Sequence, residues 1–251
     1  MTEGDGATRR GEPSGAFTGQ GSGFNELAEK LGELSRTLQA QDDVDGTLDA
    51  IVLTATDTVP GAEHASISVV LRRREVQTRA ATGDLPRAVD KAQYATGQGP
   101  CLTSLYDNHT VRLGDVETDP RWPDFAAEAR KVGLRSMLAI QLYVAGTDLG
   151  ALNLHSTRPD AFGDESEQVG LLFAAHAAIA FAGVQKLEHL RSAVSSRDLI
   201  GQAKGILMER YTLGAHEAFR LLVVASQKTN VRLVDVAEYL TRTGQLASRP
   251  D

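Results

Sequence analysis

The 251-residue chain is 41% hydrophobic and 24% charged, with a formal net charge of −7, which is typical of a globular protein. This composition excludes collagen-like and mostly disordered chains, and the length fits one large or two modest domains. No stretch resembles a membrane span of roughly 20 strongly apolar residues, and the N-terminus lacks the apolar core of a secretory signal. The single cysteine, Cys101, agrees with a cytoplasmic location.

The charge is unevenly distributed along the chain. Residues 1–189 carry 17 Lys and Arg against 27 Asp and Glu, a net charge of −10, whereas residues 190–251 carry 9 against 6, a net charge of +3. Salt confines an exposed charge to about 10 Å, so a small basic module can hold a polyanion although the whole protein is acidic.

The first two thirds of the chain predict an α+β fold with a largely antiparallel sheet and flanking helices. Residues 1–23 are rich in glycine and poor in aliphatic residues, so we expect a disordered tail. Apolar runs that alternate or continue over several residues then predict five strands, at residues 65–71, 76–82, 110–113, 136–145 and 149–156. Short helices are expected from Pro100 and over residues 124–132.

A long helix is predicted over residues 164–195. Apolar residues repeat along it every seven positions, at Phe173, Ala180, Leu187 and Val194, with Ala177, Val184 and Leu190 beside them. Such a seam favours a coiled coil and hence a homodimer. Up to about residue 182 packing on the sheet explains the pattern equally well. Residues 183–195 are therefore expected to form a helical connector.

The C-terminal part shows no strand signal. Its apolar spacing predicts three short helices, over residues 196–210, 215–228 and 233–243, and residues 247–251 are expected to be a tail.

Two stretches resemble known families. The run Ala203-Lys204-Gly205-Ile206-Leu207-Met208, followed by His216-Glu217-Ala218-Phe219, resembles the ANTAR domain, and this resemblance extends over residues 196–246. The runs Gly97-Gln98-Gly99-Pro100-Cys101 and Arg121-Trp122-Pro123 resemble the GAF domain, a small-molecule sensory fold, over residues 24–182. Two positions depart from the ANTAR pattern, because Thr212 stands where the family usually has glycine and Gly214 stands where it has serine or threonine.

The resemblance implies a transcription antitermination regulator that binds RNA stem-loops through the ANTAR module, under control of the GAF sensor. Lys204 is the first candidate for RNA contact, although a solvated lysine that covers apolar surface is the ordinary alternative. The other candidates carry amide, hydroxyl or guanidinium groups that can read or grip unpaired nucleotides: Arg197, Gln202, Arg210, Ser226, Lys228, Asn230 and Arg232.

The sensor half offers two candidates for a pocket or redox site, Cys101 and Trp122. No cofactor is identifiable beyond an unknown small-molecule GAF ligand. The histidines show no metal-ligand spacing, and no catalytic motif is present, so we expect neither a metal site nor an enzyme.

Two other functions remain open on the sequence alone. The C-terminal helices could act as a DNA-binding helix-turn-helix, but the third helix offers only Arg232 and Arg242 against Asp235 and Glu238, so DNA is not expected as the partner. The chain could also be a sensory or interaction protein without nucleic-acid binding.

Overall fold

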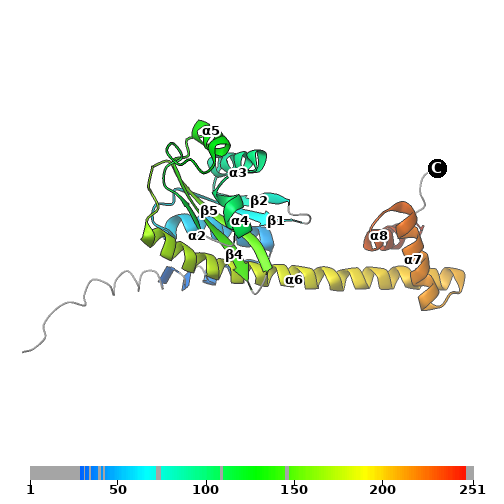
Figure 1. Ribbon diagram of the computed structural model, residues 1–251. Coiled ribbons are helices and arrows are strands. Elements are labelled where there is room, and N and C mark those ends of the chain that lie inside the picture. Colours follow the sequence, from blue (N-terminus) through cyan, green and yellow to red (C-terminus); the bar gives the residue numbers. More distant parts are fainter. Residues whose placement is uncertain are drawn as a thin grey trace, which may run out of the picture. The chain divides into compact units, whose positions relative to one another are not determined.

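The computed structural model describes residues 29–30, 32–33, 35–38, 41, 43–71, 75–107, 110–144 and 147–246 (Figure 1). The tails predicted at residues 1–23 and 247–251 lie outside the described residues. The chain divides into two compact units, residues 1–182 and 183–251.

A five-stranded antiparallel sheet with the order β2-β1-β5-β4-β3 forms the centre of the first unit. Its strands are β1 (His64–Val70), β2 (Val76–Ala81), β3 (Val111–Leu113), β4 (Ser136–Val144) and β5 (Thr147–Ser156). The predicted α+β class and antiparallel sheet are confirmed. At Gly150 the strands β1 and β5 approach so closely that a Cβ would lie 1.9 Å from the Ser68 carbonyl oxygen, which requires glycine there.

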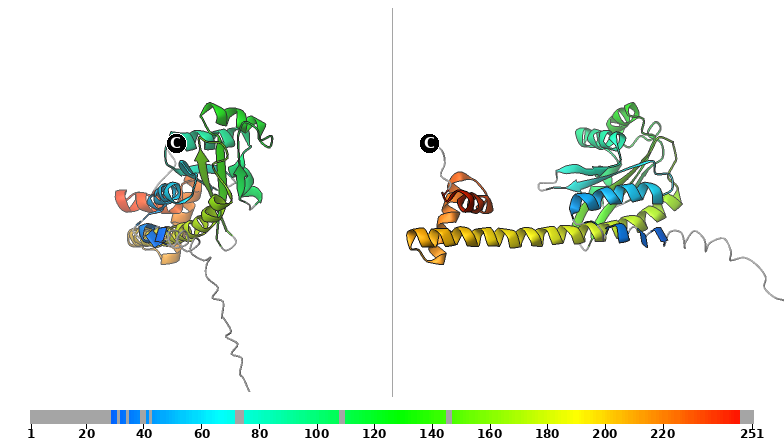
Figure 2. Two further views of the ribbon diagram at one scale, coloured as in Figure 1. Left: turned by 90° about the vertical axis from the view of Figure 1, so that its left-hand side faces the viewer. Right: turned by 180° about the vertical axis from the view of Figure 1, so that it is seen from behind.

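Helices cover both faces of the sheet (Figures 1 and 2). One face packs against α2 (Val44–Thr58) and the first part of α6 (Asp164–Tyr211), and the other against α3 (Asp84–Thr96) and α4 (Pro100–Asp107), while α5 (Pro123–Lys131) packs on α3. The sequence pattern does not reveal α3, because two of its four buried residues, Asp90 and Gln93, are polar and interrupt the apolar stripe.

The long helix α6 corrects one prediction and decides between two alternatives left open by the sequence. It runs unbroken from Asp164 to Tyr211, so the helix boundary predicted between Ser195 and Ser196 is wrong. Extending a helix costs far less than nucleating a new one, and neither proline nor glycine interrupts α6 at the two serines. Phe173 and Ala177 are fully buried in the first unit, so the first half of the seven-residue repeat packs in the core instead of pairing with another helix.

The second unit contains the C-terminal part of α6, α7 (Ala215–Thr229) and α8 (Leu233–Thr243). The ends of α7 and α8 agree with the sequence prediction within one residue. The core is small and consists of eight buried apolar residues: Ala203, Leu207, Ala218, Leu222, Ala225, Val236, Ala237 and Leu240. Four of these are alanines, which let the helices approach closely.

Among the described residues, α6 is the one helix that is long and apolar enough to span a membrane by length and composition. Of its most apolar window, 33% is buried within the protein, and a single helix of this kind is weak evidence for a span. Across the same part of the chain, no group of three His, Cys, Asp or Glu residues is placed to hold a metal ion.

Candidate nucleic-acid interface and sensor core

Three long side chains follow one side of α6 in the second unit. Arg197, Lys204 and Tyr211 stand seven residues apart, which is almost two full turns, so they leave the helix in nearly the same direction. Arg197 and Tyr211 are exposed and Lys204 is partly exposed, and none of the three has a hydrogen bond or ion pair within the described residues. We call these residues the basic-aromatic stripe. Cations next to an aromatic ring are the combination that grips and stacks single-stranded nucleotides.

Two glycines leave the helix backbone bare beside this stripe. A Cβ atom added to Gly201 or Gly205 would meet no atom within 4 Å. A glycine inside a helix costs about 0.5–1 kcal/mol relative to alanine, and no packing inside the unit explains that cost. The contrast is Gly170, where a Cβ would lie 2.6 Å from Ile140 Cδ1. The bare backbone therefore gives a partner room to approach the helix closely.

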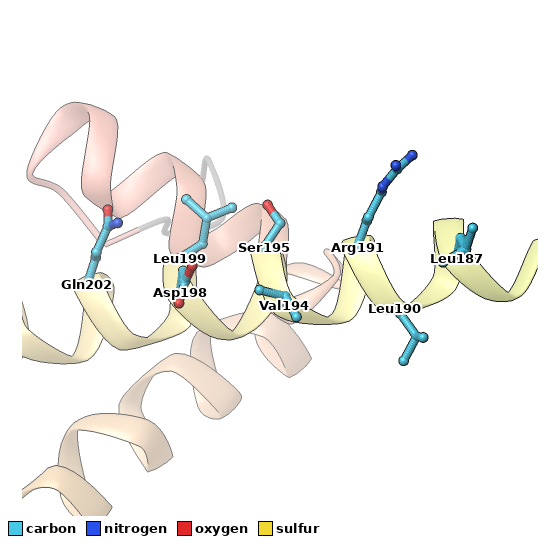
Figure 3. A pocket seen from close by; sticks show the side chains of 8 residues that line it. All are labelled: Leu187, Leu190, Arg191, Val194, Ser195, Asp198, Leu199 and Gln202. Atoms are coloured by element: carbon cyan, nitrogen blue, oxygen red, sulfur yellow. The ribbon is translucent and has the colours of Figure 1, made fainter. Parts of the chain in front are cut away.

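A groove of about 580 Å³ lies along α6 (Figure 3). All the residues that line it belong to this helix: Leu187, Leu190, Arg191, Val194, Ser195, Asp198, Leu199 and Gln202. Leu187, Leu190 and Val194 expose 54%, 55% and 63% of their surface. A row of exposed aliphatic side chains at helical spacing is typical of a surface that pairs with another helix.

A buried polar layer lies between the sheet and the helices α3 and α4 of the first unit. At its centre Asp90 accepts hydrogen bonds from the Thr78 hydroxyl (2.9 Å) and the Asn153 amide (3.2 Å). Tyr94 joins the layer through its hydroxyl, 2.6 Å from Ser68 Oγ. Burial raises the pKa of Asp90 to about 6, although its hydrogen bonds act in the opposite direction.

Cys101 belongs to the same layer and is fully buried at the start of α4. Burial, together with the nearby Asp90 carboxylate, raises the pKa of its thiol to about 12. The thiol is therefore protonated at neutral pH, which argues against the reactive cysteine considered from the sequence. Trp122 is partly buried against the apolar cluster that contains Cys101, and the Arg121 guanidinium lies 4.2 Å from its ring centre.

Family models match both units. A GAF domain model matches residues 41–182, and an ANTAR domain model matches residues 188–240. The chain belongs to the GAF domain family and carries an ANTAR domain. Both resemblances seen in the sequence are thus confirmed. No curated protein matches the chain in sequence.

Solved structures show the same fold for the GAF domain. The GAF domain of a phosphoenolpyruvate-protein phosphotransferase from Coxiella burnetii has a TM-score of 0.52 at 18% identity, covering 67% of this chain and 99% of its own. The corresponding Acinetobacter domain has a TM-score of 0.51 at 14% identity, covering 66% and 98%. Free methionine-R-sulfoxide reductase from Neisseria meningitidis, solved with its substrate, has a TM-score of 0.52 at 18% identity, covering 64% and 91%.

The ANTAR domain brings Arg197 and Lys204 to one side of α6 but places Gln202 elsewhere. Gln202 lines the groove, because residues two positions apart on a helix differ in direction by about 200°. By the same geometry Ser226 and Lys228 leave α7 on different sides. Lys228 is exposed, whereas the Ser226 hydroxyl donates to the Val231 carbonyl oxygen at 2.6 Å.

Three other candidate RNA-binding residues of the ANTAR domain have a structural role within the domain. Arg210 donates to the carbonyl oxygen of Gly244, which follows α8. Asn230 caps the C-terminus of α7 with a left-handed conformation, at φ +54°. Arg232 makes two 2.7 Å hydrogen bonds to Asp235, so its charge is largely neutralised. These structural roles account for the presence of the three residues without any contact to RNA.

Sequence reasoning missed Tyr211, Asp90 and Asn153. The seven-residue spacing from Lys204 could have revealed Tyr211, which stands one residue beyond the predicted end of the helix at residue 210. Asp90 and Asn153 stand 63 residues apart and meet only because α3 packs on β1 and β2, beside β5, so no local sequence pattern predicts this pair.

Proposed function

We propose that this protein is a cytoplasmic transcription antitermination regulator. Its ANTAR domain binds stem-loops in nascent RNA and stabilises a fold that excludes the terminator, and its GAF domain senses the signal. The observation that carries the proposal is the basic-aromatic stripe of Arg197, Lys204 and Tyr211 beside the bare backbone at Gly201 and Gly205. The two cations can contact phosphates while the ring stacks on an unpaired base of the loop.

We further propose that two copies pair through the groove on α6. Leu187, Leu190 and Val194 then become buried between two helices, which removes their apolar surface from water. Leu190 stands seven residues before Arg197 and leaves α6 in nearly the same direction, but none of the three stripe residues is among those that line the groove, so we propose that pairing ends before the basic-aromatic stripe. A dimer carries two such stripes. Once one stem-loop is bound, a second stem-loop of the same transcript is held close to the second stripe, so transcripts with two stem-loops should bind more tightly.

In this proposal the chain acts as a regulator and not as an enzyme, because the family models that match it are a GAF domain and an ANTAR domain. The signal reaches the polymerase through the RNA fold. A ligand of the GAF domain acts by binding one pairing state of α6 more tightly than the other.

RNA crosslinked to the protein in its native cell identifies the stem-loops, which can then be titrated against the purified full chain. A hairpin RNA should bind at least about tenfold more tightly than duplex DNA of matching sequence. It should also increase read-through of its terminator in a purified transcription reaction. Equal or tighter binding of the duplex would instead indicate a DNA-binding regulator, and binding of neither would indicate a sensory protein without nucleic-acid binding.

A further inference from the structure

One exposed side of α6 in the GAF domain carries no charge. Between Glu167 and Lys186 the helix contains no Asp, Glu, Lys or Arg, although several of its positions are exposed. Ile179 exposes 65% of its surface, the largest fraction of any large apolar residue in the described chain, and Leu172 exposes 48%. Large apolar side chains that are this exposed on a side without charges indicate a surface that a partner covers.

The exposed residues of this side form a row along α6. Successive members stand three or four residues apart, so they leave the helix in similar directions. We call them the exposed row: Leu172, His176, Ile179, Gly183, Leu187, Leu190 and Val194. Phe173 and Ala177, which are buried in the core, leave the helix on another side. The row therefore begins in the GAF domain and continues into residues that line the groove.

The groove alone supplies few residues for a stable pair of chains. It is lined by eight residues of one chain, whereas interfaces that hold two proteins together draw about 20–30 residues from each partner. From Leu187 to Val194 the row is about 10 Å long, and from Leu172 to Val194 it is about 33 Å long. The part of the row in the GAF domain thus supplies contact area that the proposed dimer needs.

The composition of this part of α6 favours a second helix over a lipid surface. Ala175 and Ala180 stand beside the row, one on either side, and such small residues let a second helix approach closely. Helices that lie on membranes carry Lys and Arg along their polar side, and the segment between Glu167 and Lys186 has none.

His176 is the one polar side chain in the row. Its Nδ1 lies 2.8 Å from the carbonyl oxygen of Leu172, so this nitrogen donates within its own helix and needs no partner from another molecule. A polar residue in an otherwise apolar seam lowers the stability of a helix pair and fixes its register. His176 is therefore compatible with burial between two helices, and replacing it should change the affinity of the pair.

We propose that Leu172, His176 and Ile179 bind the exposed row of a second copy, so that the GAF domain itself takes part in pairing. The inference rests on the proposed function in that it extends the proposed dimer, and it does not depend on RNA. It also gives the sensor a route to the dimer. Because the same stretch of α6 buries Phe173 in the GAF core, a ligand that favours one position of this helix changes the affinity between the copies.

The test is the dimer dissociation constant of the full chain, measured by analytical ultracentrifugation without lipid. Ile179→Asp should raise this constant at least about tenfold, because the new charge becomes buried in the pair. Leu171→Asp is the matched control, since Leu171 exposes 45% of its surface on the same helix but points about 100° away from Leu172. It should pair like the wild type. A wild type that stays monomeric, an unchanged constant in Ile179→Asp, or equal losses in both variants overturn the inference.

A second variant tests the row in the opposite direction. His176→Leu should lower the dissociation constant at least about threefold, because it makes the row fully apolar. His189→Leu, at an exposed histidine of α6 outside the row, should leave the constant unchanged. An unchanged constant in His176→Leu overturns the inference even if Ile179→Asp fails to fold, and it points to another cover for the row, such as a lipid bilayer or residues 1–28 of the same chain. RNA affinity, measured separately, decides the proposed function.

Discussion

Gln202 and Lys204 are separated by one residue on α6 but point to different sides of the helix. Gln202 lines the groove with Leu199 and Asp198, and Lys204 stands on the side of Arg197 and Tyr211. Along α6, an apolar surface at Leu187, Leu190 and Val194, suited to a second helix, therefore precedes a basic surface at Arg197 and Lys204, suited to RNA. The proposed dimer and the proposed RNA complex can consequently exist together.

Leu190→Asp together with Val194→Asp should convert the dimer to a monomer. Each substitution places a charge where an exposed aliphatic side chain otherwise becomes buried in the pair, and burying an unpaired charge costs several kcal/mol. Light scattering after size-exclusion chromatography measures the mass. The fold should survive, because both side chains are solvent-exposed within the single chain. If the variant remains a dimer, the groove is not the dimer interface.

Gly201→Ala and Gly205→Ala should stabilise the ANTAR domain and weaken RNA binding. Each adds about 0.5–1 kcal/mol of helix stability, since the new methyl group meets no atom within 4 Å. The same methyl group obstructs close approach of RNA to the backbone. Gly183→Ala is the matched control, because Gly183 also lies in α6 with open space around it. It should stabilise the helix while RNA affinity stays constant, and equal RNA affinity in all three variants would contradict the prediction.

Thr212→Gly should stabilise the second unit by about 1–2 kcal/mol. Thr212 ends α6 with φ +53°, a left-handed conformation that is strained for a β-branched residue and free of strain for glycine. Chemical denaturation measures the change in the free energy of unfolding. An unchanged or lower stability would show that the flexibility of glycine in the unfolded chain outweighs the relief of strain.

Asp90→Asn should change how the stability of the GAF domain depends on pH. The folded pKa of Asp90, about 6, lies above the ordinary value of 3.8, so the folded state holds this proton more tightly than the unfolded state. The wild type therefore loses about 3 kcal/mol through this group as pH rises from about 4 to above 6. The variant should lack this loss. Unfolding measured at pH 4, 5, 6 and 7 in both proteins isolates the difference, and parallel pH profiles would contradict the assignment.

Elements with an apolar pattern of their own were predictable from the sequence. The five strands and helices α7 and α8 show such patterns, and their predicted ends lie close to those observed. The helix α3 was not predictable, because Asp90 and Gln93 on its buried side belong to a polar layer that only the tertiary structure assembles. The continuity of α6 was missed because Ser195 and Ser196 resemble a helix start, although the backbone there remains helical.

The sequence could identify candidate residues with suitable side chains, but it could not say which of them lie on the same side of the domain. Arg197 and Lys204 share a side of α6 because helical spacing brings them together. Arg210 and Arg232 were equally plausible by residue type, yet the Gly244 carbonyl oxygen and the Asp235 carboxylate engage them. Such contacts depend on how α6, α7 and α8 meet, which spacing within one helix does not specify.

The most direct test of the central claim is the salt dependence of hairpin RNA binding by the wild type, Lys204→Ala and Lys186→Ala. Lys186 is an exposed lysine of α6 outside the basic-aromatic stripe and serves as the charge-matched control. Lys204→Ala should weaken binding by about 1–3 kcal/mol and reduce the slope of log affinity against log salt by about 0.7–0.9, and Lys186→Ala should change neither. Identical affinities and slopes in all three proteins would contradict the claim that the basic-aromatic stripe binds RNA.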